Sequence, residues 1–226
     1  EDGVKKRKIC PTIAHEDDLF WLRDDDRKNE EILAHLQEEN AFALQETAHL
    51  NSVKMDIFAD LKSRMKETDT AVPYKHGPFY YFKQTEEGKS YPLHCRVIGS
   101  VYDEIVREGG SGSGSAHVEA SLLAKRHVIL DENLIAGGHE MCDVGATSIS
   151  PHDHAKLAYS VDFSGSERYK ICVRSLDGFS SSPGPGMPGS EDLIDTDEVV
   201  GTNGAVEWHN NSNTFFYLAL NDTHRP

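Results

Sequence analysis

The spacing of hydrophobic positions changes near residue 70. Between Asp24 and Lys66 apolar residues recur every three or four positions, which predicts two helices. Asn29 can cap the first helix, and Glu30 and Glu31 complement its dipole in the first turn. The apolar positions of the two helices are Ile32, Leu33, Leu36, Ala43 and Leu44, then Phe58, Leu61 and Met65.

From Val72 onward, short β-branched and aromatic runs alternate with turn residues, which predicts strands. The predicted strands are residues 80–82, 93–97, 127–130, 157–161, 169–173 and 215–220. Residues 109–115 have the Gly/Ser composition of a flexible linker, native or engineered, and residues 180–189 are rich in Ser, Pro and Gly. We expect surface insertions at both places, near 107–118 and 179–192.

An internal repeat points to the architecture. Three residues and their spacing recur 78 positions later, as Tyr81 and Tyr159, Tyr91 and Tyr169, and Arg96 and Arg174. Repeated hairpins indicate blades of a β-propeller; two unrelated tyrosine-rich hairpins are the alternative. A blade usually takes about 40–50 residues, and the insertion at 109–115 explains much of the excess. The predicted fold is mainly β: about two to three blades of a propeller, preceded by an N-terminal α-helical arm.

Composition narrows the range of partners. Asp and Glu outnumber Lys and Arg by 38 to 23, which gives a formal charge of −15 with the 12 histidines neutral. Such a chain would repel nucleic acid and attract cationic partners. No apolar run approaches the ~20 residues of a membrane span. Cys10, Cys95, Cys142 and Cys172 form no Cys-x-x-Cys pair, so we expect reduced thiols in a cytoplasmic protein rather than a disulfide framework.

Motifs for chemistry are absent from the sequence. No Gly-x-Ser-x-Gly elbow, Walker loop or Gly-x-Gly-x-x-Gly occurs, so we predict no catalytic and no cofactor-binding residue. The segment 139–143 begins like a zinc-binding helix but lacks the second histidine, and His152 and His154 read as a solvated turn. We therefore predict no metal site; a site built on His139, His152 and His154 is the alternative.

Several segments resemble the prolyl oligopeptidase family of serine peptidases, and the later ones agree best with its oligopeptidase B group. They follow one another in the order of the family from about residue 17 to the last residue. The segments are 18–25, 88–91 with Cys95 and Arg96, 130–136, 150–151 with 157–162, 165–169, 206–208, 216–217 and 225–226.

This resemblance implies a seven-bladed propeller over an α/β-hydrolase domain. It makes residues 1–70 a helical arm that packs on the hydrolase domain, and residues 71–226 the N-terminal part of the propeller. The implied activity is cleavage of short peptides by a Ser-Asp-His triad, after Arg or Lys in oligopeptidase B, with the propeller gating substrate access. In the family the triad lies in the hydrolase domain and no position here matches it, so we expect this chain alone to be inactive.

The resemblance also implies partners. Short cationic peptides would bind the full protein, the hydrolase domain would cover the arm, and open sheet edges would favour self-association. Glu167 is the candidate for a charge that faces the gate or the other domain; an exposed hairpin carboxylate is the alternative. The alternative function is a propeller-type module that binds a protein partner without catalysis.

Overall fold

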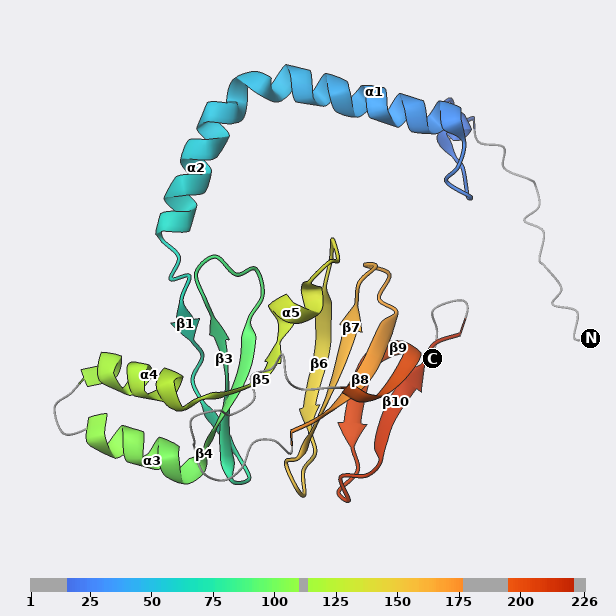
Figure 1. The fold of residues 1–226 in the computed structure, drawn as a ribbon. Helices are drawn as coiled ribbons and strands as arrows, with labels where there is room; N and C mark the ends of the chain where they lie inside the picture. The colour runs from blue at the N-terminus through green and yellow to red at the C-terminus, as the bar shows by residue number, and fades with distance from the viewer. Residues whose placement is uncertain (1–15, 110–113, 177–194, 222–226) are drawn as a thin grey trace, which may run out of the picture. The chain divides into compact units, whose positions relative to one another are not determined.

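A computed structural model describes residues 16–109, 114–176 and 195–221 (Figure 1). The chain divides into two compact units, residues 1–65 and residues 66–226. Among the described residues, no helix is both long enough and apolar enough to cross a membrane.

The first unit is helical, as the periodicity predicts. Its elements are η1 (Phe20–Leu22), α1 (Glu30–Thr47), η2 (Ala48–Leu50) and α2 (Asn51–Ser63). The side chain of Asn29 caps α1 by accepting a hydrogen bond of 3.0 Å from the backbone N–H of Glu31. Ile32 is the one hydrophobic side chain that is buried among the described residues of this unit. The apolar positions of α1 and α2 therefore find little cover within the unit itself.

The second unit begins with an antiparallel sheet, called sheet A below. Its strands are β1 (Asp69–Thr70), β2 (Tyr74–His76), β3 (Phe79–Thr85), β4 (Leu93–Ile98) and β5 (His127–Asp131). The order is β1-β3-β4-β5, and β2 also pairs with β3. Two helices, α3 (Gly99–Glu108) and α4 (Gly114–Lys125), stand between β4 and β5. The sequence indicated an insertion here but not these helices, because the Gly/Ser run interrupts the helical pattern on both sides.

A short helix, α5 (Glu132–Ala136), leads into sheet B. The strands of sheet B are β6 (Asp143–Ile149), β7 (Lys156–Asp162), β8 (Tyr169–Ser175), β9 (Asp195–Trp208) and β10 (Phe215–Ala219). They lie in the order β10-β9-β8-β7-β6, all antiparallel. The first part of β9, up to Thr202, pairs with β8, and the part from Thr202 to Trp208 pairs with β10.

The internal repeat corresponds to the hairpins β3–β4 and β7–β8. Tyr81 lies opposite Arg96 in the first hairpin, whereas Tyr159 lies opposite Cys172 in the second. The register therefore differs by two residues. A shift of two leaves each side chain on the same face of its sheet, so the repeat keeps its pattern of inward and outward residues.

Three apolar clusters form the core. The largest joins the two sheets and includes Tyr81 and Leu130 from sheet A and Leu157 and Tyr159 from sheet B. A second covers the opposite face of sheet A and contains Leu122 of α4. The third packs Val206 and Trp208 of β9 on Ala158, Ile171 and Val173 of β7 and β8. Adjacent antiparallel sheets thus stack face to face, as blades of a propeller do.

Candidate functional site

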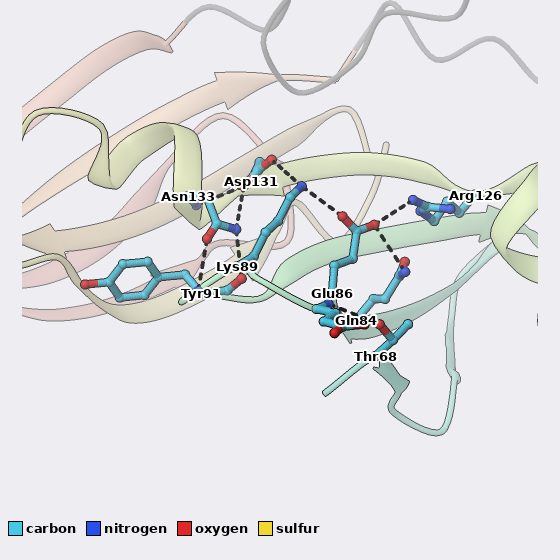
Figure 2. Close-up of polar contacts among 9 residues, drawn as sticks. Thr68, Gln84, Glu86, Lys89, Tyr91, Arg126, Asp131 and Asn133 are labelled. Atoms are coloured by element: carbon cyan, nitrogen blue, oxygen red, sulfur yellow. Dashed lines mark hydrogen bonds and ion pairs between the residues drawn. The ribbon is translucent and has the colours of Figure 1, made fainter. Parts of the chain in front are cut away.

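A network of side chains with alternating charges lies at one end of sheet A (Figure 2). Glu86, in the turn after β3, lies 2.9 Å from Nζ of Lys89 and accepts a hydrogen bond of 3.1 Å from Arg126. Gln84 donates to the same carboxylate over 3.3 Å, and Lys89 also lies 3.8 Å from Asp131. The hydrogen bond with Glu86 raises the pKa of Lys89. Because these groups are partly exposed, each pair contributes at most about 1 kcal/mol, and their main effect is to fix the shape of the turn.

Asn133 connects this turn to the start of α5. Its side chain accepts a hydrogen bond of 3.0 Å from the backbone N–H of Tyr91 and donates one of 2.8 Å to the carbonyl of Tyr91. Asp131 in turn accepts from the backbone N–H of Asn133 at 2.8 Å and so caps the short helix. Segments 88–91 and 130–136, which carry the family resemblance, are therefore in direct contact.

Glu167 lies in the turn between β7 and β8, which is the repeat equivalent of the β3–β4 turn. Figure 1 shows these two turns and α5 at the same end of the two sheets. Glu167 is exposed, has a positive φ of 58°, and lines a shallow cavity of about 280 Å³ with Tyr169, Asn203 and Leu220. Its carboxylate is thus free to face solvent or a further domain, and its gating role stays a prediction.

Asp162 holds the turn that presents Glu167. Its carboxylate accepts hydrogen bonds from the backbone N–H of Glu167 at 2.8 Å and from the hydroxyl and N–H of Ser164 at 2.7 and 2.8 Å. Burial opposes the ionisation of Asp162, but these hydrogen bonds outweigh it and lower the pKa. The orientation of Glu167 therefore rests on a carboxylate that stays ionised at neutral pH.

A buried cluster at the other end of the sheets was not foreseen from sequence. His154, in the turn before β7, is only 5% exposed, and its Nδ1 lies 3.2 Å from the hydroxyl of Tyr81. The ring of His76 lies edge-on to it, with 4.7 Å between centroids. Burial lowers the pKa of His154, and the charges of His76 and Arg96 add to the effect. The sequence indicated a solvated turn, and that holds for His152 and Asp153 but is wrong for His154.

The alternative of a metal site finds no support in the part of the chain that is described. No group of three or more His, Cys, Asp or Glu side chains there could hold a metal ion. His139 instead stacks on Phe163 at 3.8 Å between centroids, while His154 packs on Tyr81. Cys95, Cys142 and Cys172 are buried free thiols, and burial raises the pKa of Cys95 to about 12. Cys10 lies outside the described residues.

Comparison with known proteins gives the family. Residues 4–226 match the model of the prolyl oligopeptidase N-terminal beta-propeller domain. Among curated proteins, the dipeptidyl aminopeptidase BI of Pseudoxanthomonas mexicana is 30% identical over 206 residues, which are 89% of this chain and 25% of that protein. Protease 2 of Moraxella lacunata is 27% identical over 229 residues, or 99% of this chain and 29% of that one.

Solved structures agree with this assignment. Oligopeptidase B from Leishmania major superposes with a TM-score of 0.72 and 30% identity, over 93% of this chain and 25% of that chain. Oligopeptidase B from Trypanosoma brucei, in a closed form with covalently bound antipain, superposes with a TM-score of 0.73 and 32% identity. The match covers 100% of this chain and 27% of that chain. The chain spans about a quarter of the length of these relatives. Part of a β-propeller with a helical segment before it is therefore the observed fold, and the chain belongs to the prolyl oligopeptidase family of serine peptidases.

Proposed function

We propose that the full-length protein is an oligopeptidase-B-like serine peptidase that cleaves short peptides after Arg or Lys. This chain would supply part of the gate and none of the triad. The observation that carries the proposal is the pair of oligopeptidase B structures at 30% and 32% identity, with TM-scores of 0.72 and 0.73. Prolyl oligopeptidase B from Galerina marginata shares the fold at 16–17% identity and TM-scores of 0.58–0.59.

The helical arm supports a second part of the proposal, that the α/β-hydrolase domain covers it. Large apolar side chains are exposed along the whole arm, from Phe20 and Trp21 through Phe42 to Phe58 and Leu61. Apolar surface of that extent, on helices with little cover of their own, marks an interaction site. The arm is thus a docking segment, and the expected partner is the domain that carries the triad.

The charge of the chain supports the proposed substrate class. A formal charge of −15 attracts cationic peptides over a distance set by the salt concentration. Glu86, Glu87 and Glu167 belong to the two turns at one end of the sheets. Carboxylates placed there would raise the local concentration of peptides with several basic residues. A cytoplasmic location is part of the same proposal, since buried free thiols persist where thiols are kept reduced.

The test uses the full-length protein and matched fluorogenic peptides that end in arginine, lysine, proline or citrulline. Citrulline has nearly the shape of arginine without its charge, so it separates charge from size. We expect efficient cleavage after arginine and lysine and very slow cleavage after citrulline and proline. Cleavage after proline, or only of dipeptides from the N-terminus, would contradict the proposed specificity.

Labelling with a fluorophosphonate, which needs an activated serine, tests where the chemistry lies. One serine of the full-length protein should be labelled, and none in the isolated 226-residue chain. Stoichiometric labelling of the isolated chain would contradict the proposal. Absence of labelling in the full-length protein, together with no Gly-x-Ser-x-Gly beyond this chain, would favour a non-catalytic interaction module.

Self-association of the isolated chain follows from the edge of sheet B. β10 is a terminal strand of that sheet, and Phe216, Tyr217 and Leu218 on it are exposed. An edge strand with apolar side chains is a template for pairing with another chain. We propose that the isolated chain dimerises through β10, which sedimentation at increasing concentration would detect; a monomer at high concentration would contradict this.

A further inference from the structure

A cavity of about 360 Å³ lies between the two sheets of the second unit. Strands β2, β3 and β4 of sheet A form most of one wall, and β6 and β9 of sheet B form most of the other. Both β2 and β6 are edge strands, so the cavity lies where an edge of one sheet meets an edge of the other. A volume of about 300–1,000 Å³, with apolar walls and a few polar groups, is typical of a site for a small ligand.

The wall of sheet A carries a positive charge. Lys83 of β3 and His94 of β4 lie opposite each other in the ladder, so their side chains are neighbours on one face. Tyr81, two residues before Lys83, packs toward sheet B, and the pleat puts Lys83 on the same side. His94 is buried, and its Nε2 lies 2.6 Å from Oε1 of Glu132. Lys83 is exposed, and its amine has no ion pair or hydrogen bond with any other residue that the structure describes.

The wall of sheet B carries the opposite charge. Glu207 of β9 lines the cavity, is exposed, and forms no ion pair within the described part of the chain. The indole N–H of Trp208 donates to the carbonyl of Ser148 at 3.0 Å, which holds this part of β9 against β6. Apolar side chains of Ile149 and Leu157 line the same cavity. The cavity therefore offers a ligand a cation on one wall, an anion on the other, and apolar surface.

We infer that this cavity binds the C-terminal end of a short peptide whose last residue is Arg or Lys. Lys83 pairs with the terminal carboxylate, Glu207 pairs with the side-chain cation, and the apolar stem of that side chain packs on the apolar wall. The identity of the ligand rests on the proposed function, because cleavage after Arg or Lys gives one product with such an end. Both charges are exposed, so each ion pair is weak, and we expect a dissociation constant of about 1 mM.

The experiment measures acetylation of Lys83 by an amine-reactive reagent in the full-length protein, read peptide by peptide by mass spectrometry. The serine is first blocked with the fluorophosphonate, so that no probe is hydrolysed. The probe is benzoyl-glycyl-arginine, which has no amine of its own to react. At about 10 mM it should slow the acetylation of Lys83 by about fivefold or more, because most sites are then filled.

Lys75 is the matched control residue for this measurement. It is exposed on β2, and its Nζ lies 5.7 Å from the ring centroid of Tyr80. Tyr80 packs on the face of sheet A opposite to Tyr81, so Lys75 lies away from the cavity. Its acetylation should not change with the probe. Equal protection of Lys75 and Lys83 would overturn the inference.

Two related probes separate the contributions of the two charges. The amide of benzoyl-glycyl-arginine lacks the carboxylate, and benzoyl-glycyl-citrulline lacks the cation. Each should need about a three- to fivefold higher concentration for half protection of Lys83, as the loss of one exposed ion pair implies. The same protection by the amide would overturn the pairing with Lys83, and the same protection by the citrulline peptide would overturn the pairing with Glu207.

The variant Glu207→Gln tests the second wall. It should raise the concentration of the arginine probe for half protection of Lys83 by about threefold or more and leave that of the citrulline probe unchanged. Glu104→Gln, at an exposed position of α3, is the control and should change neither concentration. Equal effects of the two variants would overturn the inference.

Failure of this inference and failure of the proposed function can be told apart. If the full-length protein cleaves after Arg and Lys but the arginine probe leaves Lys83 unprotected, only the inference is overturned. If no serine reacts with the fluorophosphonate, the proposed peptidase activity fails. The acetylation of the untreated protein then still decides whether the cavity binds such an end.

Discussion

The backbone carbonyl of His154 accepts a hydrogen bond of 2.6 Å from Nη1 of Arg96, which fastens a turn of sheet B to a buried cation of sheet A. The guanidinium of Arg96 lies 4.1 Å from the ring centroid of Phe79 and also donates to the carbonyl of Leu176 at 3.4 Å. One residue of the internal repeat thus contacts two separate segments of the next blade. Only a planar fork of donors can reach both carbonyls while it stacks on a ring.

Replacing Arg96 should loosen the contact between the blades. In Arg96→Met the carbonyls of His154 and Leu176 lose a partner that is itself only 1% exposed. A buried acceptor left without its donor costs about 1–3 kcal/mol, so we expect a local destabilisation of about 3 kcal/mol. Hydrogen exchange of the amides in β4 and β7 of the full-length protein measures it. Arg107→Met, at an exposed position of α3, should change exchange little, and equal protection in both variants would contradict the assigned role.

Gly77 and Gly88 offer a matched pair of substitutions. Both have positive φ, 58° and 79°, so alanine strains the backbone at each by about 1–2 kcal/mol. A Cβ on Gly77 would lie 2.0 Å from Nε2 of His154, whereas one on Gly88 meets nothing within 4 Å. We expect Gly77→Ala to lower the unfolding midpoint clearly more than Gly88→Ala. Equal midpoints would show that His154 can move aside freely.

The stability of the propeller region should fall as the pH drops below about 6.5, the ordinary pKa of histidine. Burial lowers the pKa of His127 to about 4, and burial also lowers the pKa of His154. Between pH 6.5 and 4 the unfolded state therefore binds more protons than the folded state, and stability rises with pH in this window. Unfolding midpoints measured across this range should show that slope. The slope should be smaller in His127→Gln; an unchanged slope would contradict the assignment.

Glu167 should speed the association of peptides with several basic residues. In water, two opposite unit charges about 10 Å apart attract each other by about 0.4 kcal/mol, which corresponds to roughly a twofold change in association rate. In the full-length enzyme, Glu167→Gln should lower kcat/KM for a dibasic peptide by roughly that factor at low salt, and less at 1 M salt, where the Debye length is about 3 Å. A single-arginine peptide should respond less. Glu104→Gln, at an exposed position of α3, is the control, and the same loss there would assign the effect to net charge alone.

The sequence was sufficient to predict the helices and hairpins whose residue patterns are local. The period of apolar residues predicted α1 and α2, and the cap at Asn29 is the observed one. The repeat of Tyr81, Tyr91 and Arg96 predicted two equivalent hairpins, because side chains two positions apart in a strand lie on the same face of the sheet. Gly165 is a turn signal, and the turn between β7 and β8 forms there; that Glu167 in this turn faces the gate or another domain stays a prediction.

Tertiary structure decided which polar residues and which helices are buried, because burial depends on segments that are far apart in the chain. His154 looks like a solvated turn residue, yet it is buried by Tyr81 and His76, more than 70 positions away. The helices α3 and α4 flank a Gly/Ser-rich run, and their apolar side chains are buried by packing on one face of sheet A. Glu86 shows both cases: Lys89 lies in the same turn, three residues further on, whereas Arg126 follows a distant helix and reaches the carboxylate only because β4 pairs with β5.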